Sequence, residues 1–410
     1  MRLIYNIGIL LYINAIWIAS FFNHKAKLWI KGRKNIFSEI KKTKRGTERL
    51  VWFHASSLGE FEQGRPVMEE LKEKEPATKI LLTFFSPSGY EIRKNYQGAD
   101  YVFYLPADTP ANAAKFVKYF RPDVAVFVKY EFWFNYLNVL HSQKIPTYII
   151  SAIFRKNQIF FKAWGGFYRN ILHLFNLIFV QNEESAKLLA SINVCNYKIT
   201  GDTRFNRVKQ IADSAKTIEK AELFCKGEKA IICGSTWQPD EELLFSYINN
   251  SNDNNKWIIA PHEIGGSHIK GIVEKSQRKI AKLSDNVNTI QQADVLIIDC
   301  IGLLSAVYRY GKLAYIGGGF GVGIHNTLEA AVYGLPVVFG SNYKRFNEAV
   351  ELINSGGGFS VNNEDDLHKI FDNLLNDEET RTAAGQHAGN YVLSHLGATK
   401  AIIEIISTNL

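Results

Sequence analysis

The sequence has few cysteines, and they lack the spacings at which cysteines usually act. Its four cysteines, Cys195, Cys225, Cys233 and Cys300, lie far apart in a chain of 410 residues and form no CxxC pair. This excludes a disulfide scaffold and a zinc site built on paired cysteines, and it suits a reducing compartment. The ten histidines show no HExxH motif or other metal-ligand spacing. We therefore expect neither a bound metal nor a cofactor.

The sequence also lacks a P-loop, an internal repeat and any low-complexity segment. Hydrophobic residues make up 46% and charged residues 21%, which is ordinary for a globular protein with a full core. A disordered chain, a collagen-like repeat and a multi-span membrane protein are excluded. At roughly 100–200 residues per domain, the length predicts two domains, or at most three.

Acidic residues are nearly absent from the first 45 residues. That segment holds ten Lys and Arg but only one acid, Glu39, so its net charge is +9. The rest of the chain has a net charge of −1, which gives the total of +8. A nucleic-acid-binding protein usually spreads basic residues over its binding face, so nucleic acid is not the expected partner.

The same basic segment opens with an apolar run from Leu3 to Phe22, interrupted by Asn6 and Asn14. The run is near the length that spans a bilayer as a helix. It is either a signal-anchor helix with its basic flank in the cytoplasm or a helix lying in the membrane surface, bound to anionic lipid. The third alternative is a buried core helix. A cleaved signal peptide is disfavoured because no small-x-small site follows the run.

From residue 50 onward, short apolar runs alternate with helical patterns. This alternation predicts an α/β protein with parallel sheets covered by helices on both faces. The expected strands are Leu50–His54, Ile80–Phe85, Tyr101–Leu105, Val124–Val128, Thr147–Ser151, Leu177–Val180, Tyr197–Thr200, Ala230–Ser235, Trp257–Ala260, Val295–Asp299, Leu313–Ile316 and Val337–Phe339.

The pattern predicts two Rossmann-like domains that face a central cleft. We expect residues 1–45 to be the membrane-associated segment, 46–205 the first domain and 206–228 a polar, helical linker. Residues 229–385 form the second domain, and 386–410 belong to a C-terminal helix, running from Glu378 to Ile406, that crosses back toward the first domain. Ligands of such sheets bind at the carboxyl ends of the strands, so the strand-to-helix loops are candidate sites.

Three loops of the first domain carry chemistry. His54–Glu60 follows the first strand, and Glu60 is either a general base or a helix-capping carboxylate. Lys129–Asn135 contains Glu131. This segment is either a functional loop at the end of a strand or a packed loop with a Lys–Glu ion pair. Gly201–Asn206 contains Arg204, which either holds a phosphate or carboxylate or lies in a surface turn.

The second domain contains the most specific motif, the glycine-rich loop Gly317–Ala331. A strand leads into this loop and a helix is expected near Asn326. Because the backbone N–H groups of such a loop and helix start can bind an anion, we expect an anion site here. Glu329, three residues later, is placed to accept hydrogen bonds from a ribose. Three smaller loops join the same site: Gly234-Ser235-Thr236, Pro261-His262-Glu263 and Ile301-Gly302-Leu303.

Taken together and in order, these motifs resemble the Kdo (3-deoxy-D-manno-octulosonic acid) transferases of lipopolysaccharide synthesis, glycosyltransferase family 30. The resemblance covers nearly the whole chain. The motifs that carry it are Trp29–Lys34, His54–Glu60, Glu131–Trp133, Gly201–Phe205, His325–Ala331, Pro336 and Phe346-Asn347.

The resemblance implies a GT-B fold and an inverting, metal-independent transfer of Kdo from CMP-Kdo to a lipid A precursor at the cytoplasmic face of the inner membrane. It implies that Glu60 is the general base and that Arg204 stabilises the departing phosphate. The residues that it assigns to CMP-Kdo binding are Pro261, His262, Ile301, Gly302, Leu303, Asn326, Thr327, Leu328 and Glu329.

The chain departs from the family pattern at a few positions. Lys129 and Phe134 stand where Glu and Pro are common, which leaves Glu131 as the candidate second catalytic carboxylate. Leu303 replaces a common Glu, and Arg204 replaces a common Lys. Two other functions stay open: another GT-B nucleotide-sugar transferase or an epimerase, and a non-catalytic, membrane-tethered protein that binds sugar nucleotides.

Overall fold

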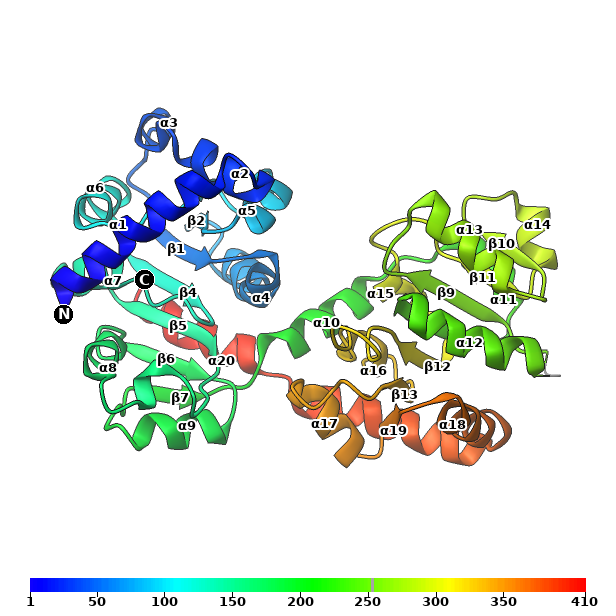
Figure 1. Cartoon of the computed structure of the whole chain (residues 1–410). Coiled ribbons are helices and arrows are strands. Elements are labelled where there is room, and N and C mark those ends of the chain that lie inside the picture. The colour runs from blue at the N-terminus through cyan, green and yellow to red at the C-terminus, as the bar shows by residue number, and fades with distance from the viewer. Residues whose placement is uncertain (252–253) are drawn as a thin grey trace. The chain divides into compact units, whose positions relative to one another are not determined.

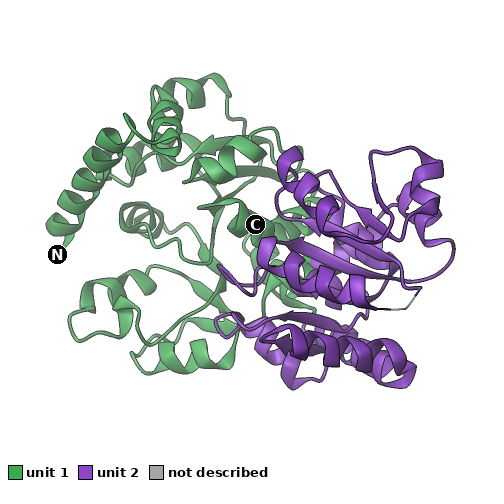
Figure 2. Ribbon diagram, turned by 45° about the vertical axis from the view of Figure 1, so that its right-hand side comes forward, with its two compact units in different colours: residues 1–207, 396–410 green, residues 208–395 purple. Residues whose placement is uncertain are grey.

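The computed structural model describes residues 1–251 and 254–410 and divides the chain into two compact units. Unit 1 contains residues 1–207 and 396–410, and unit 2 contains residues 208–395 (Figure 2). The boundary falls inside helix α10 (Thr203–Ser214), so one continuous helix leads from the first unit into the second.

Unit 1 is built on a parallel sheet of seven strands in the order β3-β2-β1-β4-β5-β6-β7 (Figure 1). Every residue of β1, β4 and β5 is buried, because helices cover both faces of the sheet. The strands are β1 (Leu50–Ala55), β2 (Lys79–Phe84), β3 (Tyr101–Tyr104), β4 (Val124–Val128), β5 (Thr147–Ala152), β6 (Leu177–Val180) and β7 (Tyr197–Ile199).

The helices of unit 1 enclose two apolar clusters, one on each face of the sheet. The C-terminal helix α20 (Ala398–Ser407) completes one of them, because its buried Ile402, Ile403 and Ile406 join the cluster that contains Phe61 of α4. The other covering helices are α4 (Leu58–Lys74), α5 (Pro87–Arg93), α6 (Pro110–Phe120), α7 (Phe134–Ser142), α8 (Gly166–Leu172) and α9 (Glu183–Ala190).

Three further helices precede the sheet: α1 (Arg2–Ala19), α2 (His24–Arg33) and α3 (Ile36–Lys42). By length and composition α1 is apolar enough to cross a membrane. It nevertheless lies along unit 1 in Figure 1, where the hydroxyl of Tyr5 donates to Asp108 at 2.6 Å and the amide of Asn135 donates to Asn6 at 2.9 Å. One face of α1 is therefore docked on the protein.

Unit 2 has a second parallel sheet of seven strands, in the order β10-β11-β9-β8-β12-β13-β14. Its strands are β8 (Ala230–Thr236), β9 (Trp257–Pro261), β10 (Ile280–Lys282), β11 (Val295–Ile297), β12 (Gly311–Ile316), β13 (Val337–Gly340) and β14 (Gly358–Val361). Its helices are α11 (Glu219–Cys225), α12 (Gln238–Asn250), α13 (Gly266–Lys275), α14 (Val287–Gln292), α15 (Leu304–Val307), α16 (Leu328–Ala331), α17 (Asn347–Asn354), α18 (Glu364–Asn376) and α19 (Glu378–Ser394).

The two parallel Rossmann-like sheets and all twelve expected strands are confirmed. The expectation of one C-terminal helix from Glu378 to Ile406 is wrong. Two helices, α19 and α20, occupy this stretch, because Gly397 between them adopts a φ of +110°, which a continuing right-handed helix does not allow.

Candidate active site

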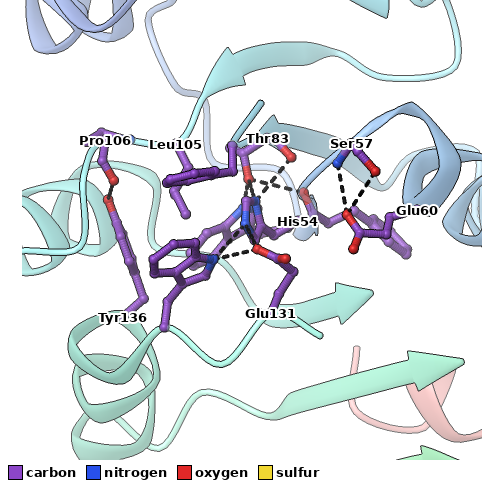
Figure 3. A network of polar contacts seen from close by, with 12 residues as sticks. His54, Ser57, Glu60, Thr83, Leu105, Pro106, Glu131 and Tyr136 are labelled. Carbon is purple, nitrogen blue, oxygen red and sulfur yellow. Dashed lines mark hydrogen bonds and ion pairs between the residues drawn. The ribbon is translucent and has the colours of Figure 1, made fainter. Parts of the chain in front are cut away.

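The strand order of unit 1 reverses between β1 and β4, and the loops after these two strands lie at that point. In parallel sheets of this kind ligands bind at such a switch point, at the carboxyl ends of the strands. The loop after β1 carries Glu60, and the loop after β4 carries Glu131 (Figure 3). The structure therefore brings together two carboxylates that are 71 residues apart in the sequence.

Glu60 is the third residue of α4 and caps the start of that helix. Its Oε2 accepts the backbone N–H of Ser57 at 2.8 Å and the Ser57 hydroxyl at 3.3 Å, so both bonds end on one oxygen. Burial, and then the charge of Glu131, raise the pKa of Glu60, although the N–H groups of Ser57 and Ser56 oppose the shift. A carboxylate with a raised pKa at a ligand-binding edge suits a general base.

Glu131 is held by a buried polar network that extends to the neighbouring strand (Figure 3). Its Oε2 accepts from Nε2 of His54 at 2.9 Å and from the indole N–H of Trp133 at 2.5 Å. On the other side of the imidazole, Nδ1 of His54 lies 2.8 Å from the hydroxyl of Thr83, which accepts from the indole of Trp52. With only 5% of its surface exposed, Glu131 is fixed in place beside Glu60.

The sequence did not point to His54 and Thr83 as members of this network. His54 was expected both to end the strand Leu50–His54 and to open the loop motif, and the structure places it in β1 with no exposed surface. Thr83 lies in β2, directly opposite His54 in the register of the two strands. The only signal in the sequence was that His54 and Thr83 are polar residues within two largely apolar strands.

Arg204 begins α10 and is oriented by an acidic neighbour. Its Nε donates to Asp202 at 2.7 Å, and its backbone N–H donates to the same carboxylate at 2.9 Å. Burial is the largest cause that raises the pKa of Tyr130. The charge of Glu60 also raises this pKa, whereas the charges of Arg155 and Arg204 lower it. Glu60, Arg155 and Arg204 follow the parallel strands β1, β5 and β7, so all three lie at the carboxyl-end edge of the sheet. Arg155, just after β5, was not predicted.

In unit 2 the glycine-rich loop is anchored by a buried aspartate that the sequence did not reveal. Asp240, 1% exposed, accepts the backbone N–H of Gly318 at 2.8 Å, the N–H of Trp237 at 2.9 Å and the hydroxyl of Tyr315 at 2.9 Å. Burial raises the pKa of Asp240 against these hydrogen bonds. Helix α16, expected near Asn326, begins at Leu328 and is only four residues long.

Three aromatic rings stack beside this loop. The rings of Trp237 and His262 lie 4.3 Å apart, and those of His262 and His325 lie 4.7 Å apart, with interplanar angles of 22° and 28°. The indole N–H of Trp237 donates to Nε2 of His325 at 3.0 Å. Burial and the neighbouring His262 lower the pKa of His325. Of the three rings, His262 was expected at the donor site, while Trp237 was not.

The other expected donor residues divide into two groups. Glu329 accepts hydrogen bonds from the amide of Asn326 at 3.0 Å and from the hydroxyl of Ser305 at 2.5 Å, and the second bond joins α15 to α16. Ile301 is 86% exposed, and Gly302 has a φ of +92°. In contrast, the side chains of Pro261, Thr327 and Leu328 are buried, and Leu303 is the N-cap residue of α15.

Residues 1–251 and 254–410 contain no group of three or more His, Cys, Asp or Glu side chains arranged to hold a metal ion. The polar groups of both sites are instead carboxylates, imidazoles, guanidinium groups and backbone N–H donors. Such groups bind anions and move protons.

Comparisons with known proteins identify relatives over most of the chain. Residues 31–207 match the family described as "3-Deoxy-D-manno-octulosonic-acid transferase (kdotransferase)". The chain is 28% identical over 342 residues to the 3-deoxy-D-manno-octulosonic acid transferase of Aquifex aeolicus, covering 82% of this chain and 88% of the relative. It is 26% identical over 406 residues to that of Chlamydia trachomatis serovar A, covering 95% and 92%.

Solved structures share the fold at low sequence identity. UDP-GlcNAc 2-epimerase from Neisseria meningitidis superposes with a TM-score of 0.65 at 17% identity, covering 88% of this chain and 100% of that one. MurG of Acinetobacter baumannii gives 0.55 at 12% identity, covering 88% and 99%. These neighbours support the GT-B fold and leave the activity to be argued from the site.

Proposed function

We propose that this chain is a glycosyltransferase of the Kdo transferase family, which its match over residues 31–207 and its relatives support, and that it moves Kdo from CMP-Kdo to a hydroxyl of a lipid A precursor, lipid IVA. The transfer inverts the anomeric carbon and needs no metal. The observation that carries the proposal is Glu60: a carboxylate of raised pKa, at the switch point of the unit 1 sheet, with both Ser57 bonds on a single oxygen.

In this mechanism Glu60 is the general base. As the acceptor hydroxyl attacks the anomeric carbon, its proton moves to Oε1 of Glu60 and the bond to the phosphate of CMP breaks, so CMP leaves with the electron pair. The charge of Glu131 keeps the pKa of Glu60 raised and so increases its proton affinity. Glu131, bonded to His54 and Trp133, acts by position, and Arg204 balances the charge of the departing phosphate.

We assign donor binding to unit 2. The stacked rings of Trp237, His262 and His325 offer a flat surface for the base or ribose. The carboxylate of Glu329 can accept hydrogen bonds from the ribose hydroxyl groups, and the amide of Asn326 can donate or accept them. The glycine loop approaches the phosphate with backbone N–H groups. The buried Pro261, Thr327 and Leu328 would support the segments that carry these groups.

We further propose that α1 lies in the cytoplasmic surface of the inner membrane. Tyr5 and Asn6 fix one face of the helix to unit 1, while large apolar side chains remain exposed on the other face. A spanning helix could not keep those polar contacts with the body, so the in-plane alternative is favoured. The exposed apolar residues are Leu3, Ile4, Ile7, Leu10, Leu11, Trp17, Ile18, Phe21 and Phe22.

A row of stacked rings connects this helix with the candidate base. Tyr12 of α1 stacks on Phe85 with centroids 6.1 Å apart, and Phe85 stacks on Trp133 at 4.7 Å. The indole of Trp133 donates to Glu131, which is coupled to Glu60. A lipid acceptor held at α1 would therefore present its sugar hydroxyl to the correct edge of the sheet.

The test is transfer itself. The protein is incubated with CMP-Kdo and lipid IVA, and the products are weighed by mass spectrometry for increments of one, two or three Kdo units. E60Q keeps an oxygen for the helix cap but cannot accept the proton, so we expect turnover to fall roughly 10²–10⁴-fold with unchanged CMP-Kdo binding. E70Q, which neutralises a half-buried glutamate of the same helix that pairs with Lys74, is the matched control.

Each outcome decides between the open alternatives. Near-normal turnover by E60Q would remove Glu60 from the base role. Inhibition by UDP but not by CMP would favour another nucleotide-sugar enzyme, an epimerase included. Tight CMP-Kdo binding with no product from any lipid A precursor would leave a non-catalytic binding protein.

A further inference from the structure

The strongest feature outside the candidate active site is a basic cavity between α3 and α6. Its volume is about 910 Å³. Lys41, Lys44 and Arg45 line one side of it, and Lys115, Lys118 and Arg121 line the other. Six cations around one cavity are more than a small surface region needs to stay soluble.

Most of these cations lack an acidic partner. In the described parts of the chain, only Arg45 of the six is within 4 Å of a carboxylate, at 3.7 Å from Glu48. Lys115 instead lies 4.2 Å above the ring of Phe37. The remaining positive charges repel one another, so a bound anion would relieve that repulsion.

The floor of the cavity is apolar, because Phe37, Ile40 and Phe120 line it together with the cations. Inorganic phosphate has no apolar part that could contact this floor. A phosphate carried on a glycerol and acyl chain matches both features, since the phosphate meets the lysines and the alkyl part meets the rings.

A second cavity lies beside the basic cavity and leads toward α1. This neighbouring cavity, of about 630 Å³, shares Phe37 with the basic cavity and is also lined by Ile13, in the middle of α1. The basic cavity is therefore linked through its neighbour to the helix that we propose to lie in the membrane surface.

The cavity is also separate from the candidate active site. Thr47 and Arg121 come before β1 and β4, whereas Glu60 and Glu131 come after the same two strands. A strand of six residues spans about 20 Å. The reacting hydroxyl of an acceptor at Glu60 and a phosphate in this cavity thus lie at opposite edges of the sheet.

We propose that the α3–α6 cavity binds the phosphate headgroup of an anionic membrane phospholipid and so fixes unit 1 on the bilayer. The inference rests on the membrane association proposed above and assigns it a specific lipid site. It is distinct from the attraction of the basic segment to any negative surface.

The test compares two triple variants of the full chain that lose equal charge. K41Q/K118Q/R121Q neutralises three of the basic side chains that line the cavity, and none of the three belongs to a described ion pair. K156Q/K187Q/K198Q removes three exposed lysines elsewhere on unit 1. Binding is measured by sedimentation with vesicles of phosphatidylcholine, alone or mixed with phosphatidylglycerol or with oleic acid at matched surface charge.

We expect the cavity variant to lose phosphatidylglycerol binding by about fivefold per cation, roughly 100-fold in all, and the control variant by less than about threefold. On the oleic acid vesicles the two variants should differ little. Equal losses on phosphatidylglycerol would overturn the proposal, because they would show that only net charge matters.

Soluble competitors separate a lipid site from a plain phosphate site. Short-chain phosphatidylglycerol should displace the protein from vesicles at concentrations where inorganic phosphate of equal ionic strength does not. Equal competition by inorganic phosphate would contradict the lipid assignment. A cavity variant that binds phosphatidylglycerol normally but needs more lipid IVA for transfer would also contradict it, since the cavity would then serve the acceptor.

Failure of the lipid site is distinguishable from failure of the proposed function. The cavity variant should transfer Kdo to a deacylated, water-soluble acceptor at the rate of the unmodified protein. If the triple variant does not fold, as judged by its thermal unfolding, K118E alone carries the test, with an expected loss of about 25-fold. Unchanged phosphatidylglycerol binding by a folded K118E would refute the proposal.

Discussion

Replacing Asp240 by alanine should release the glycine loop of unit 2. Its carboxylate accepts three hydrogen bonds: two from backbone N–H groups, those of Gly318 and Trp237, and one from the hydroxyl of Tyr315. The side chain is 1% exposed, so water does not replace the carboxylate without rearrangement. In D240A three buried donors lose their acceptor, and the strand, the loop and α12 lose their common anchor.

The expected loss of stability follows from these three donors. A buried donor left without an acceptor costs about 1–3 kcal/mol, so D240A, which leaves three such donors, should lose roughly 3–9 kcal/mol. For a unit of this size each kcal/mol corresponds to about 2–4 °C in Tm, which gives a fall of at least about 6 °C. D240N is the matched control: its oxygen can accept both N–H groups and its amide can donate to Tyr315, so about 1 kcal/mol is expected.

The pH dependence gives an independent check. Burial raises the pKa of Asp240 in the folded protein above its ordinary value of 3.8. A carboxyl group of raised pKa contributes stability that is present at pH below its unfolded pKa and is lost as the pH rises through the folded pKa. Because D240N has no such titration, the Tm difference between the unmodified protein and D240N should shrink as the pH rises from about 4 to about 7.

The assay combines thermal unfolding with calorimetric titration of CMP. We expect D240A to bind CMP at least about tenfold more weakly, while D240N stays within about threefold. If D240A melts within about 2 °C of the unmodified protein and binds CMP equally well, Asp240 does not hold the loop and the assignment is wrong.

Three further predictions address other parts of the molecule. E131Q should lower the raised pKa of Glu60 and so move the acid limb of the kcat/KM profile to lower pH; an unmoved limb would show that the charge of Glu131 does not act on the base. W237A should raise the KM for CMP-Kdo about fivefold, from the loss of roughly 1 kcal/mol of ring stacking, whereas W237F should not; equal KM values for the two would contradict a stacking role. Y5F removes the 2.6 Å bond to Asp108 and should loosen α1 by about 1–3 kcal/mol, seen as faster proteolysis near residue 20 with little change in the Tm of unit 2; an unchanged cleavage rate would show that α1 is held by other contacts.

Apolar runs were sufficient to predict most of the fold. Strands such as β1, β4 and β5 are buried along their whole length, so they appear in the sequence as continuous hydrophobic segments. Two strands were missed for the opposite reason. In β10 (Ile280–Lys282) a single residue is buried, and in β14 (Gly358–Val361) a run of glycines precedes a short edge strand.

The site could be predicted only as a set of loops. The rule that ligands bind at the carboxyl ends of parallel strands selected the segments that contain Glu60 and Glu131, and the structure places both segments at one edge of the sheet. His54, the partner of Glu131, is itself held by Thr83 through strand register, so this network joins residues 77 and 29 positions apart in the sequence. No local pattern encodes such pairs, so the network around the carboxylates became visible only in the structure.

Glu60 shows why two interpretations of one residue could not be separated in the sequence. A glutamate three residues into a helix, after a serine, is the signature of a capping box, and the structure contains that cap. The cap also serves the proposed chemistry, because bonding Oε2 to Ser57 orients the side chain and directs Oε1 away from the helix end. Desolvation and the charge of Glu131 then raise the pKa despite the two backbone N–H groups that oppose it. The capping and general-base roles are therefore compatible, and the cap is what would hold the base in position.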